Sequence, residues 1–191
     1  RILCFKLKKD TDGPVSRILN RPISLMISKA LLKTGITPNQ ISVLSCVIGL
    51  AGASLFFFGE YFYLILGGII IHIHSIVDGC DGEIARLKLR RTKYGGYLDS
   101  FLDRYVDAAI ILGLVYGYWS INGDITIWVI GFVTLIGSFL NSYTSDKYDS
   151  IFKDKSMKKS SKFRMGRDVR LLIITIGALT NQIPIILIIL A

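Results

Sequence analysis

Long apolar runs separated by short polar segments characterise this chain from residue 41 onward. The runs cover residues 41–58, 61–77, 99–119, 125–145, 169–179 and 183–191. The first four are each close to the ~20 residues that a helix needs to cross the hydrocarbon core of a bilayer. The pattern therefore predicts an all-α integral membrane protein with six transmembrane helices, the last of them truncated.

The segment before these runs has a different periodicity. Between residues 21 and 33, apolar residues recur three and four positions apart, namely Ile23, Met26, Ile27, Ala30 and Leu31. This pattern predicts an amphipathic helix that is too polar to span a bilayer, so we expect it to lie in the membrane interface. After it, Thr37, Pro38 and Gln40 have the form of a helix start, because Thr37 can act as the cap and Gln40 completes a capping box.

Composition and charge place the chain in a membrane and orient it there. Hydrophobic residues make up 51% of the chain, and 23 Lys and Arg against 14 Asp and Glu leave a net charge of +9. The basic residues gather in the N-terminal arm, in 88–93 and in 147–170, whereas the turns near Glu60 and Asp124 contain none. By the positive-inside rule the basic segments face the cytoplasm, so we expect a protein of the cytoplasmic membrane. The partner that this charge indicates is membrane lipid and not nucleic acid.

The polarity also suggests two regions. Residues 1–19 are polar and basic, and we expect them to be an N-terminal arm or a linker from a preceding domain, since the chain begins at Arg1 and not at Met. Residues 20–191 would form one membrane domain. Three scattered cysteines, Cys4, Cys46 and Cys80, predict neither a disulfide framework nor a zinc site.

Two pairs of aspartates carry the chemistry that the sequence suggests. Asp78 and Asp81 are three apart at the end of the second apolar run, and Asp99 and Asp103 are four apart at the start of the third. Each pair projects from one helix face, and the short loop between them predicts antiparallel neighbouring helices with the pairs facing each other. Four carboxylates this close repel one another unless cations neutralise them, and oxygen ligands favour Mg²⁺, Mn²⁺ or Ca²⁺.

Residues between the aspartate pairs suit a phosphate ligand. Gly82 and Gly95 lack side chains where a ligand would come close to the backbone, and Arg86 can bind a pyrophosphate with two parallel hydrogen bonds. Carboxylates, metal ions, an arginine and bare backbone together indicate phosphoryl transfer. In such a reaction two metals clamp the phosphate while a carboxylate deprotonates the attacking hydroxyl.

This spacing also resembles that of a known family, the CDP-alcohol phosphotransferases, whose pattern is D-x2-D-G-x2-A-R-x8-G-x3-D-x3-D. The chain matches every fixed position, at Asp78, Asp81, Gly82, Ala85, Arg86, Gly95, Asp99 and Asp103. The resemblance implies an enzyme in which the hydroxyl of a second alcohol displaces CMP from a CDP-alcohol donor. Asp103 would be the catalytic base. Homodimers are common in such families, so we expect one here.

The resemblance further implies a division of roles among the site residues. Asp78, Asp81, Asp99 and Asp103 would contact Mg²⁺ or Mn²⁺, as two ions. The residues of the nucleotide pocket would be Asn39, Gly82, Ala85, Arg86 and Gly95.

Basic residues near the same membrane depth are candidates for binding the acceptor. Arg167 and Arg170 stand three apart at the start of the fifth run, and Lys147 follows the polar end of the fourth. In family members that use phosphorylated acceptors, a basic pocket near this place holds the acceptor phosphate, so the resemblance implies this role for all three. The other interpretation is a positive-inside signal that touches anionic headgroups, which we prefer for the lysines of 158–162.

Other polar residues have simpler interpretations. His72 and His74 are two apart and point to different faces, so we prefer packing to a shared metal. Asp107 lies one turn beyond Asp103 and either orients a catalytic group or pairs with Arg104. A different class of function, a membrane cation-binding or transport protein, would also place carboxylates in the membrane, but the spacing argues against it.

The motif specifies CDP and leaves both alcohols open. One class of enzyme joins CDP-diacylglycerol to inositol phosphate or glycerol phosphate, and another joins CDP-inositol to inositol phosphate. Residues 11–17 and 20–24 resemble the junction in bifunctional proteins of thermophilic archaea and bacteria. Those proteins join an inositol-1-phosphate cytidylyltransferase to a di-myo-inositol-phosphate-phosphate synthase. The resemblance favours CDP-inositol and a phosphorylated polyol acceptor, giving an osmolyte precursor, with a phospholipid synthase as the alternative.

Overall fold

The computed structural model describes residues 16–32, 34–89, 92–151 and 166–191, and this part of the chain is helical, with no strand. The elements are the π-helical turn η1 (Ser16–Asn20) and the α-helices α2 (Arg21–Leu32), α3 (Pro38–Phe56), α4 (Tyr61–Leu87), α5 (Lys93–Asn122), α6 (Thr126–Ile151), α7 (Arg167–Thr180) and α8 (Ile183–Leu190). The first fifteen residues of the predicted arm and the basic segment 152–165 lie outside the described residues.

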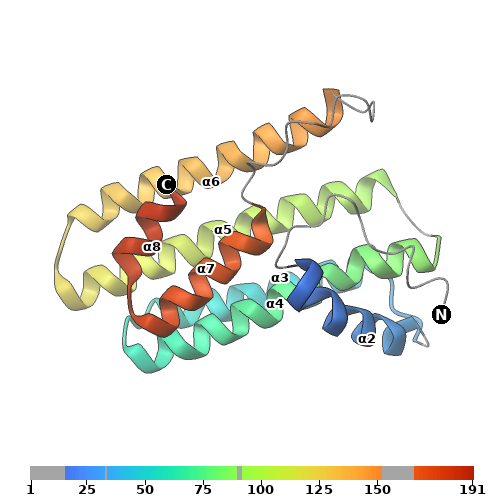
Figure 1. Cartoon of the computed structure of the whole chain (residues 1–191), viewed down its shortest axis with the longest axis horizontal. Helices are drawn as coiled ribbons and strands as arrows, with labels where there is room; N and C mark the ends of the chain where they lie inside the picture. Colours follow the sequence, from blue (N-terminus) through green and yellow to red (C-terminus); the bar gives the residue numbers. More distant parts are fainter. Residues whose placement is uncertain (1–15, 33, 90–91, 152–165) are drawn as a thin grey trace.

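Helices α3 to α8 form a closed ring. Around it, α3 packs on α4, α4 on α7, α7 on α8, α8 on α6, α6 on α5, and α5 back on α3 (Figure 1). Apolar side chains such as Phe56, Ile71 and Leu114 are fully buried between the helices. Others point outward, and Phe132 is 64% exposed on α6. A large apolar outer surface is the expected surface of a protein whose solvent is lipid.

Three of the described helices are long and apolar enough to cross a membrane: Pro38–Phe56, Tyr61–Leu87 and Thr126–Ser145. The sequence predicted six spans. Helix α5 has the length but carries charged residues in its first half, and α7 and α8 have only 14 and 8 residues. The all-helical membrane fold is therefore supported, and three spans meet these criteria.

Glycines allow α5 to approach α3 closely. A Cβ atom added at Gly113 would lie 2.7 Å from the carbonyl oxygen of Ala53, and one added at Gly117 would overlap the carbonyl oxygen of Phe56. Small residues four apart let two helix backbones come together in a membrane, where dispersion contacts replace the hydrophobic effect. This contact holds α5, and hence its aspartates, against the rest of the bundle.

Helix starts are set by side-chain caps. The Thr37 capping box is confirmed, because Thr37 Oγ1 accepts from the backbone N–H of Gln40 and Gln40 Oε1 accepts from the backbone N–H of Thr37. Thr92 caps α5 by accepting from the Gly95 amide at 2.9 Å, so the helix begins at Lys93 and not near Asp99 as predicted. Gly95 therefore lies in the first turn of α5.

The amphipathic helix α2 packs on α4 (Figure 1), and its polar residues Arg21, Ser24 and Ser28 are buried. Arg21 and Ser24 are buried, whereas Ile23 and Met26 are 42% and 72% exposed. The Arg21 guanidinium meets Glu83 of α4 at 2.5 Å, and Ser24 Oγ donates to the same carboxylate oxygen at 2.7 Å. Both side chains of this pair are almost completely buried, at 8% and 0% exposure. The sequence did not predict this contact.

Candidate active site

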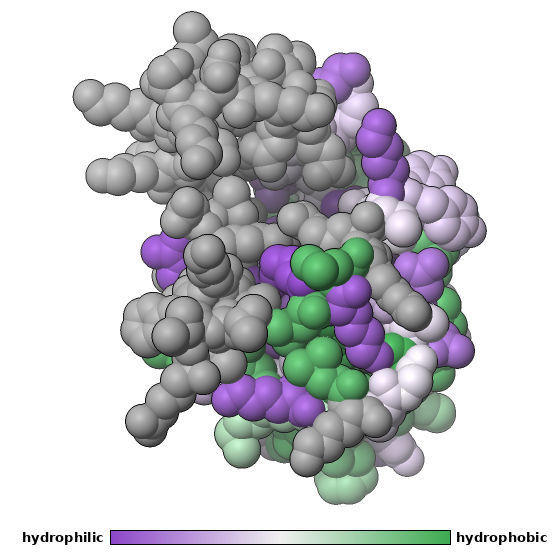
Figure 2. All heavy atoms as spheres, turned by 90° about the vertical axis from the view of Figure 1, so that its right-hand side faces the viewer, coloured by the Kyte–Doolittle hydropathy of each residue, from purple (hydrophilic) through white to green (hydrophobic). Residues whose placement is uncertain are grey.

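The aspartate pairs meet at one end of the bundle, although α4 and α5 are not close neighbours. Both helices pack on α3 and not substantially on each other, so α4 and α5 are not the direct neighbours that were predicted. The predicted facing of the two aspartate pairs is confirmed, because Asp78 of α4 meets Asp99 and Asp103 of α5. Gly113 and Gly117 let α5 approach α3 closely. The carboxylates therefore come together through their side chains. Figure 2 looks onto this end, where hydrophilic and hydrophobic residues lie interleaved over the described surface.

Three of the four predicted carboxylates converge. Asp78, Asp99 and Asp103 each offer an oxygen atom, and these atoms lie within 4.8 Å of one another. Asp81 flanks this cluster. One of its oxygens accepts from Ser42 Oγ at 2.5 Å, the other accepts from the Gly82 amide, and its carboxyl group lies next to that of Asp99. An all-oxygen set of this kind can hold a hard divalent cation.

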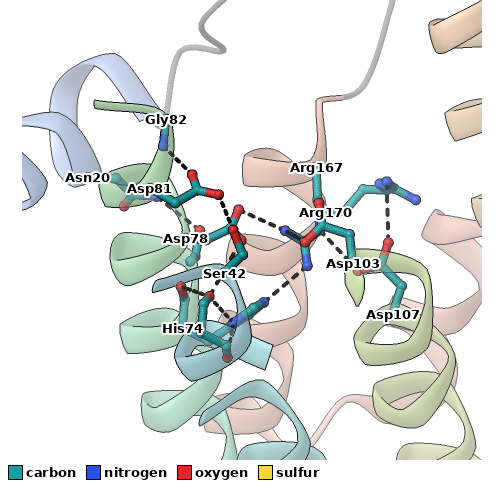
Figure 3. Close-up of polar contacts among 12 residues, drawn as sticks. Asn20, Ser42, His74, Asp78, Asp81, Gly82, Asp103, Asp107, Arg167 and Arg170 are labelled. Carbon is teal, nitrogen blue, oxygen red and sulfur yellow. Dashed lines mark hydrogen bonds and ion pairs between the residues drawn. The ribbon is translucent and has the colours of Figure 1, made fainter. Parts of the chain in front are cut away.

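Arg167 supplies a positive charge at the centre of the cluster (Figure 3). Its Nη1 lies 2.9 Å from Asp78 Oδ2 and 2.8 Å from Asp103 Oδ1, and its Nε donates to Asp107 Oδ1 at 3.2 Å. The side chain is 16% exposed. A guanidinium held between carboxylates offsets their mutual repulsion where little water can screen it. The structure thus places Arg167 among the aspartates, in contact with two of the predicted metal ligands.

His74 completes the surroundings of Arg167. Its Nδ1 lies 2.8 Å from the carbonyl oxygen of Ser45. A carbonyl oxygen only accepts, so Nδ1 carries the proton and Nε2 has a free lone pair. Arg167 Nη2 donates to that lone pair at 3.0 Å. His74 is thus a packed residue, as preferred from the sequence, but it also orients the arginine of the site.

Arg170 faces away from the cluster, toward α6. It donates to Ser138 Oγ at 2.5 Å and to Ser142 Oγ at 3.3 Å, and its Nη2 is 3.7 Å from Asp107 Oδ2. Asp107 also meets Arg104 at 3.4 Å. The predicted pairing of Asp107 with Arg104 is confirmed, Asp107 also contacts Arg167, and a role in orienting a catalytic group stays a prediction.

The structure brings the residues predicted to read the nucleotide together in two pairs. A Cβ atom added at Gly95 would lie 2.9 Å from Asn39 Oδ1, which places Asn39 beside that glycine. At Gly82 an added Cβ would lie 3.6 Å from the guanidinium of Arg86. Ala85 is half-buried on the same helix, and Lys147 is exposed on α6. The nucleotide and phosphate roles of these residues remain predictions.

Sequence reasoning missed the polar side chains of α3 that face the site. Ser42 holds Asp81, and Ser45 Oγ lies 2.9 Å from His74 Nδ1 and 3.4 Å from Asp78 Oδ1. The available signal was the recurrence of Asn39, Ser42 and Ser45 every three residues at the start of an otherwise apolar helix.

Comparison with known proteins identifies the family of this chain. The family model for CDP-alcohol phosphatidyltransferase matches residues 35–191. The chain belongs to this family. Among curated CDP-alcohol phosphatidyltransferase relatives, the bifunctional IPC transferase and DIPP synthase of Aquifex aeolicus is 38% identical over 183 residues, covering 94% of this chain and 41% of the relative. The archaetidylinositol phosphate synthase of Pyrococcus horikoshii is 33% identical over 162 residues, covering 83% of this chain and 78% of the relative.

Solved structures show the same fold. The phosphatidylinositol phosphate synthase of Mycobacterium tuberculosis in its apo form matches with a TM-score of 0.67 at 26% identity, over 86% of each chain. The same enzyme with CDP-DAG bound matches with a TM-score of 0.72 at 24% identity, over 88% of this chain and 86% of that one. This chain spans about two-fifths of the length of the Aquifex bifunctional relative.

Proposed function

We propose that this chain transfers a phospho-alcohol from a CDP-alcohol to the hydroxyl of a second alcohol and releases CMP. The observation that carries the proposal is the convergence of Asp78, Asp99 and Asp103 beside the signature glycines. The acceptor oxygen would form a bond to the phosphorus that carries the donor alcohol, and the phosphoanhydride bond to CMP would break. The acceptor's proton would pass to a carboxylate oxygen of Asp103.

Divalent metal ions fit the site. The donor set consists of carboxylate oxygens that already surround a cationic side chain, so the cluster accommodates positive charge. We assign two Mg²⁺ or Mn²⁺ ions to Asp78, Asp81 and Asp99, with Asp103 touching one of them. When bound, the ions would neutralise the pyrophosphate and polarise the reacting phosphoryl group. A structure of the Mycobacterium synthase contains manganese.

The chain's own residues would orient the two substrates. On the nucleotide side, Gly82, Ala85 and Gly95 would admit the CDP group against the backbone, with Arg86 binding its pyrophosphate and Asn39 alongside. On the acceptor side, we assign the phosphate to Arg167, with Arg170 and Lys147 as further cations. Arg167 is the member of this set that already lies next to Asp103.

The same proposal covers the membrane arrangement. We place α3 to α8 in the cytoplasmic membrane as six spans, the sixth truncated, with the active site facing the cytoplasm, and residues 1–19 as an N-terminal arm or a linker from a preceding domain. The outward apolar face of α2, with Met26 72% exposed, supports an interfacial position because that face would meet lipid. We also propose a homodimer.

Of the two substrate classes, we favour CDP-inositol with inositol phosphate, giving di-myo-inositol phosphate phosphate. The support is the 36–40% identity to four bifunctional IPC transferases and DIPP synthases. The specific alternative is a phospholipid synthase that uses CDP-diacylglycerol. It is supported by the archaetidylinositol phosphate synthase, of which this chain covers 78%.

Measuring CMP release distinguishes these possibilities. The purified chain in lipid nanodiscs is given Mg²⁺, inositol 1-phosphate and either CDP-inositol or CDP-diacylglycerol, and we expect CMP with CDP-inositol.

Asp103→Asn should abolish turnover and keep nucleotide binding, whereas Asp124→Asn, in the exposed turn before α6, should match the wild type. Wild-type rates in Asp103→Asn would refute the assignment of the base. Cation flux into vesicles without CMP release from either donor would support a transporter instead.

A further inference from the structure

Arg167 has a protein partner on each of its three guanidinium nitrogens. Nη1 lies between Asp78 and Asp103, Nε donates to Asp107, and Nη2 donates to His74 (Figure 3). These four partners differ in one respect. Asp78 and Asp103 belong to the cluster whose oxygens converge within 4.8 Å, and Asp107 and His74 lie outside it.

A metal ion and the Arg167 guanidinium would compete for the same two carboxylates, Asp78 and Asp103. Nη1 lies 2.8–2.9 Å from one oxygen of Asp78 and one of Asp103. A Mg²⁺ ion held by both of these carboxylates would lie about 2.0–2.1 Å from an oxygen of each, so it would compete with Nη1 for the space between the two groups. The two cations also repel each other where few water molecules screen them. We therefore expect metal binding to displace Nη1 from between Asp78 and Asp103.

The two partners outside the cluster determine where Arg167 goes. Asp107 and His74 retain Nε and Nη2, so the guanidinium can turn about that edge and remain beside the cluster. The N–H groups of Nη1 would then be available beside the aspartate cluster, and the planar guanidinium matches the geometry of a phosphate group.

We propose that Arg167 is a tethered counter-ion of the aspartate cluster, released by metal binding to hold the anionic acceptor. This rests on the proposed function, because it assigns the order of binding at the same site. An acceptor phosphate that binds the released Arg167 favours the metal-bound state, so metal and anion must increase each other's affinity by the same factor. Before the metal binds, the anion has to compete with two carboxylates for Arg167. The pairing of Arg167 with Asp78 and Asp103 thus disfavours binding of the acceptor when no metal is bound.

The test measures Mn²⁺ binding, and not turnover. The dissociation constant of Mn²⁺ is determined by electron paramagnetic resonance on the purified chain in nanodiscs, with and without inorganic phosphate, after correction for manganese phosphate in solution. In the wild type, phosphate should tighten Mn²⁺ binding severalfold. In Arg167→Gln, Mn²⁺ alone should bind roughly tenfold more tightly than in the wild type, because a charge-assisted hydrogen bond no longer has to be broken. Phosphate should then add less than about twofold, since the coupling residue is gone.

Arg104→Gln is the matched control. It removes the same charge from the same region, and Arg104 contacts Asp107 and Ser142. We expect a small tightening of Mn²⁺ binding in this variant and an unchanged effect of phosphate. Arg167→Lys, which keeps the charge, should bind Mn²⁺ nearly as the wild type does and guards against a folding defect in the glutamine variant.

Two results would overturn the proposal: equal tightening in Arg104→Gln and Arg167→Gln, or full phosphate coupling in Arg167→Gln. Failure of the proposed function would look different, because CMP would then not be released while the Mn²⁺ and phosphate coupling persisted.

Discussion

Removing the guanidinium of Arg21 should release α2 from the helix that carries the first aspartate pair. Arg21→Ala leaves the Glu83 carboxylate fully buried, with Ser24 still donating to one oxygen. The second oxygen, Oε2, has no hydrogen-bond partner among the described residues. A buried charge in this situation favours any conformation that lets water reach it, and undocking of α2 is the smallest such change.

The size of the effect follows from the burial of the pair. Removing one partner of a buried ion pair costs about 3–5 kcal/mol, and exposures of 8% and 0% leave little solvent to screen the loss. Each ~1.4 kcal/mol changes an equilibrium about tenfold. The population with α2 undocked should therefore rise at least ~100-fold.

Cys80 reports this opening directly. It is completely buried, it packs with Ile27 and Leu31 of α2, and its thiol lies 3.5 Å from the Ser24 carbonyl oxygen. Alkylation of Cys80 requires α2 to move away, so its rate follows the open population. In a Cys4→Ser background, buried Cys46 on α3 is the internal reference for opening of the whole bundle.

Two variants make the result decisive. Lys29→Ala removes an exposed charge from the same helix and should leave the Cys80 rate unchanged. Arg21→Met combined with Glu83→Gln removes both charges and should restore labelling to within about tenfold of the wild type. The reasoning is refuted if Arg21→Ala labels Cys80 no faster than Lys29→Ala. Equal acceleration of Cys46 would show general unfolding instead of undocking.

Three further predictions follow from the geometry. Gly95→Ala should lower kcat/KM for the CDP-alcohol about tenfold or more, because its Cβ would lie 2.9 Å from Asn39 Oδ1. Gly96→Ala, whose Cβ would have nothing within 4 Å, should leave kcat/KM unchanged, and steady-state assays of CMP release compare the two variants. Gly117→Ala should lower the Tm in detergent by several degrees because its Cβ overlaps a backbone carbonyl of α3, and an unchanged Tm would contradict the close approach. Removal of divalent ions with EDTA should abolish CMP release, and Mg²⁺ or Mn²⁺ should restore it while K⁺ does not.

Much of the fold could be predicted because helix-forming signals are local. Apolar runs in the sequence gave the approximate positions of α3 to α8, and the Thr37 capping box was correct in both of its hydrogen bonds. The start of α5 was misjudged by about two turns, because one Thr92 hydroxyl extends the helix into a basic segment that resembles a loop. The amphipathic pattern of α2 indicated a helix but not which face would be buried. That choice depends on Glu83, which is 62 residues away in sequence.

The sequence alone determined the spacing of the aspartates, glycines and Arg86, and with it the family and the residues predicted to carry the chemistry. Only the tertiary structure decided how these residues meet. Glycine contacts set α5 against α3, oxygens of Asp78, Asp99 and Asp103 converge, and Asp81, beside Asp99, is held by Ser42. The structure also placed Arg167 of α7 between Asp78 and Asp103, an ion pair across 89 residues of chain. No local pattern encodes such a contact, because it depends on which helices pack around the ring.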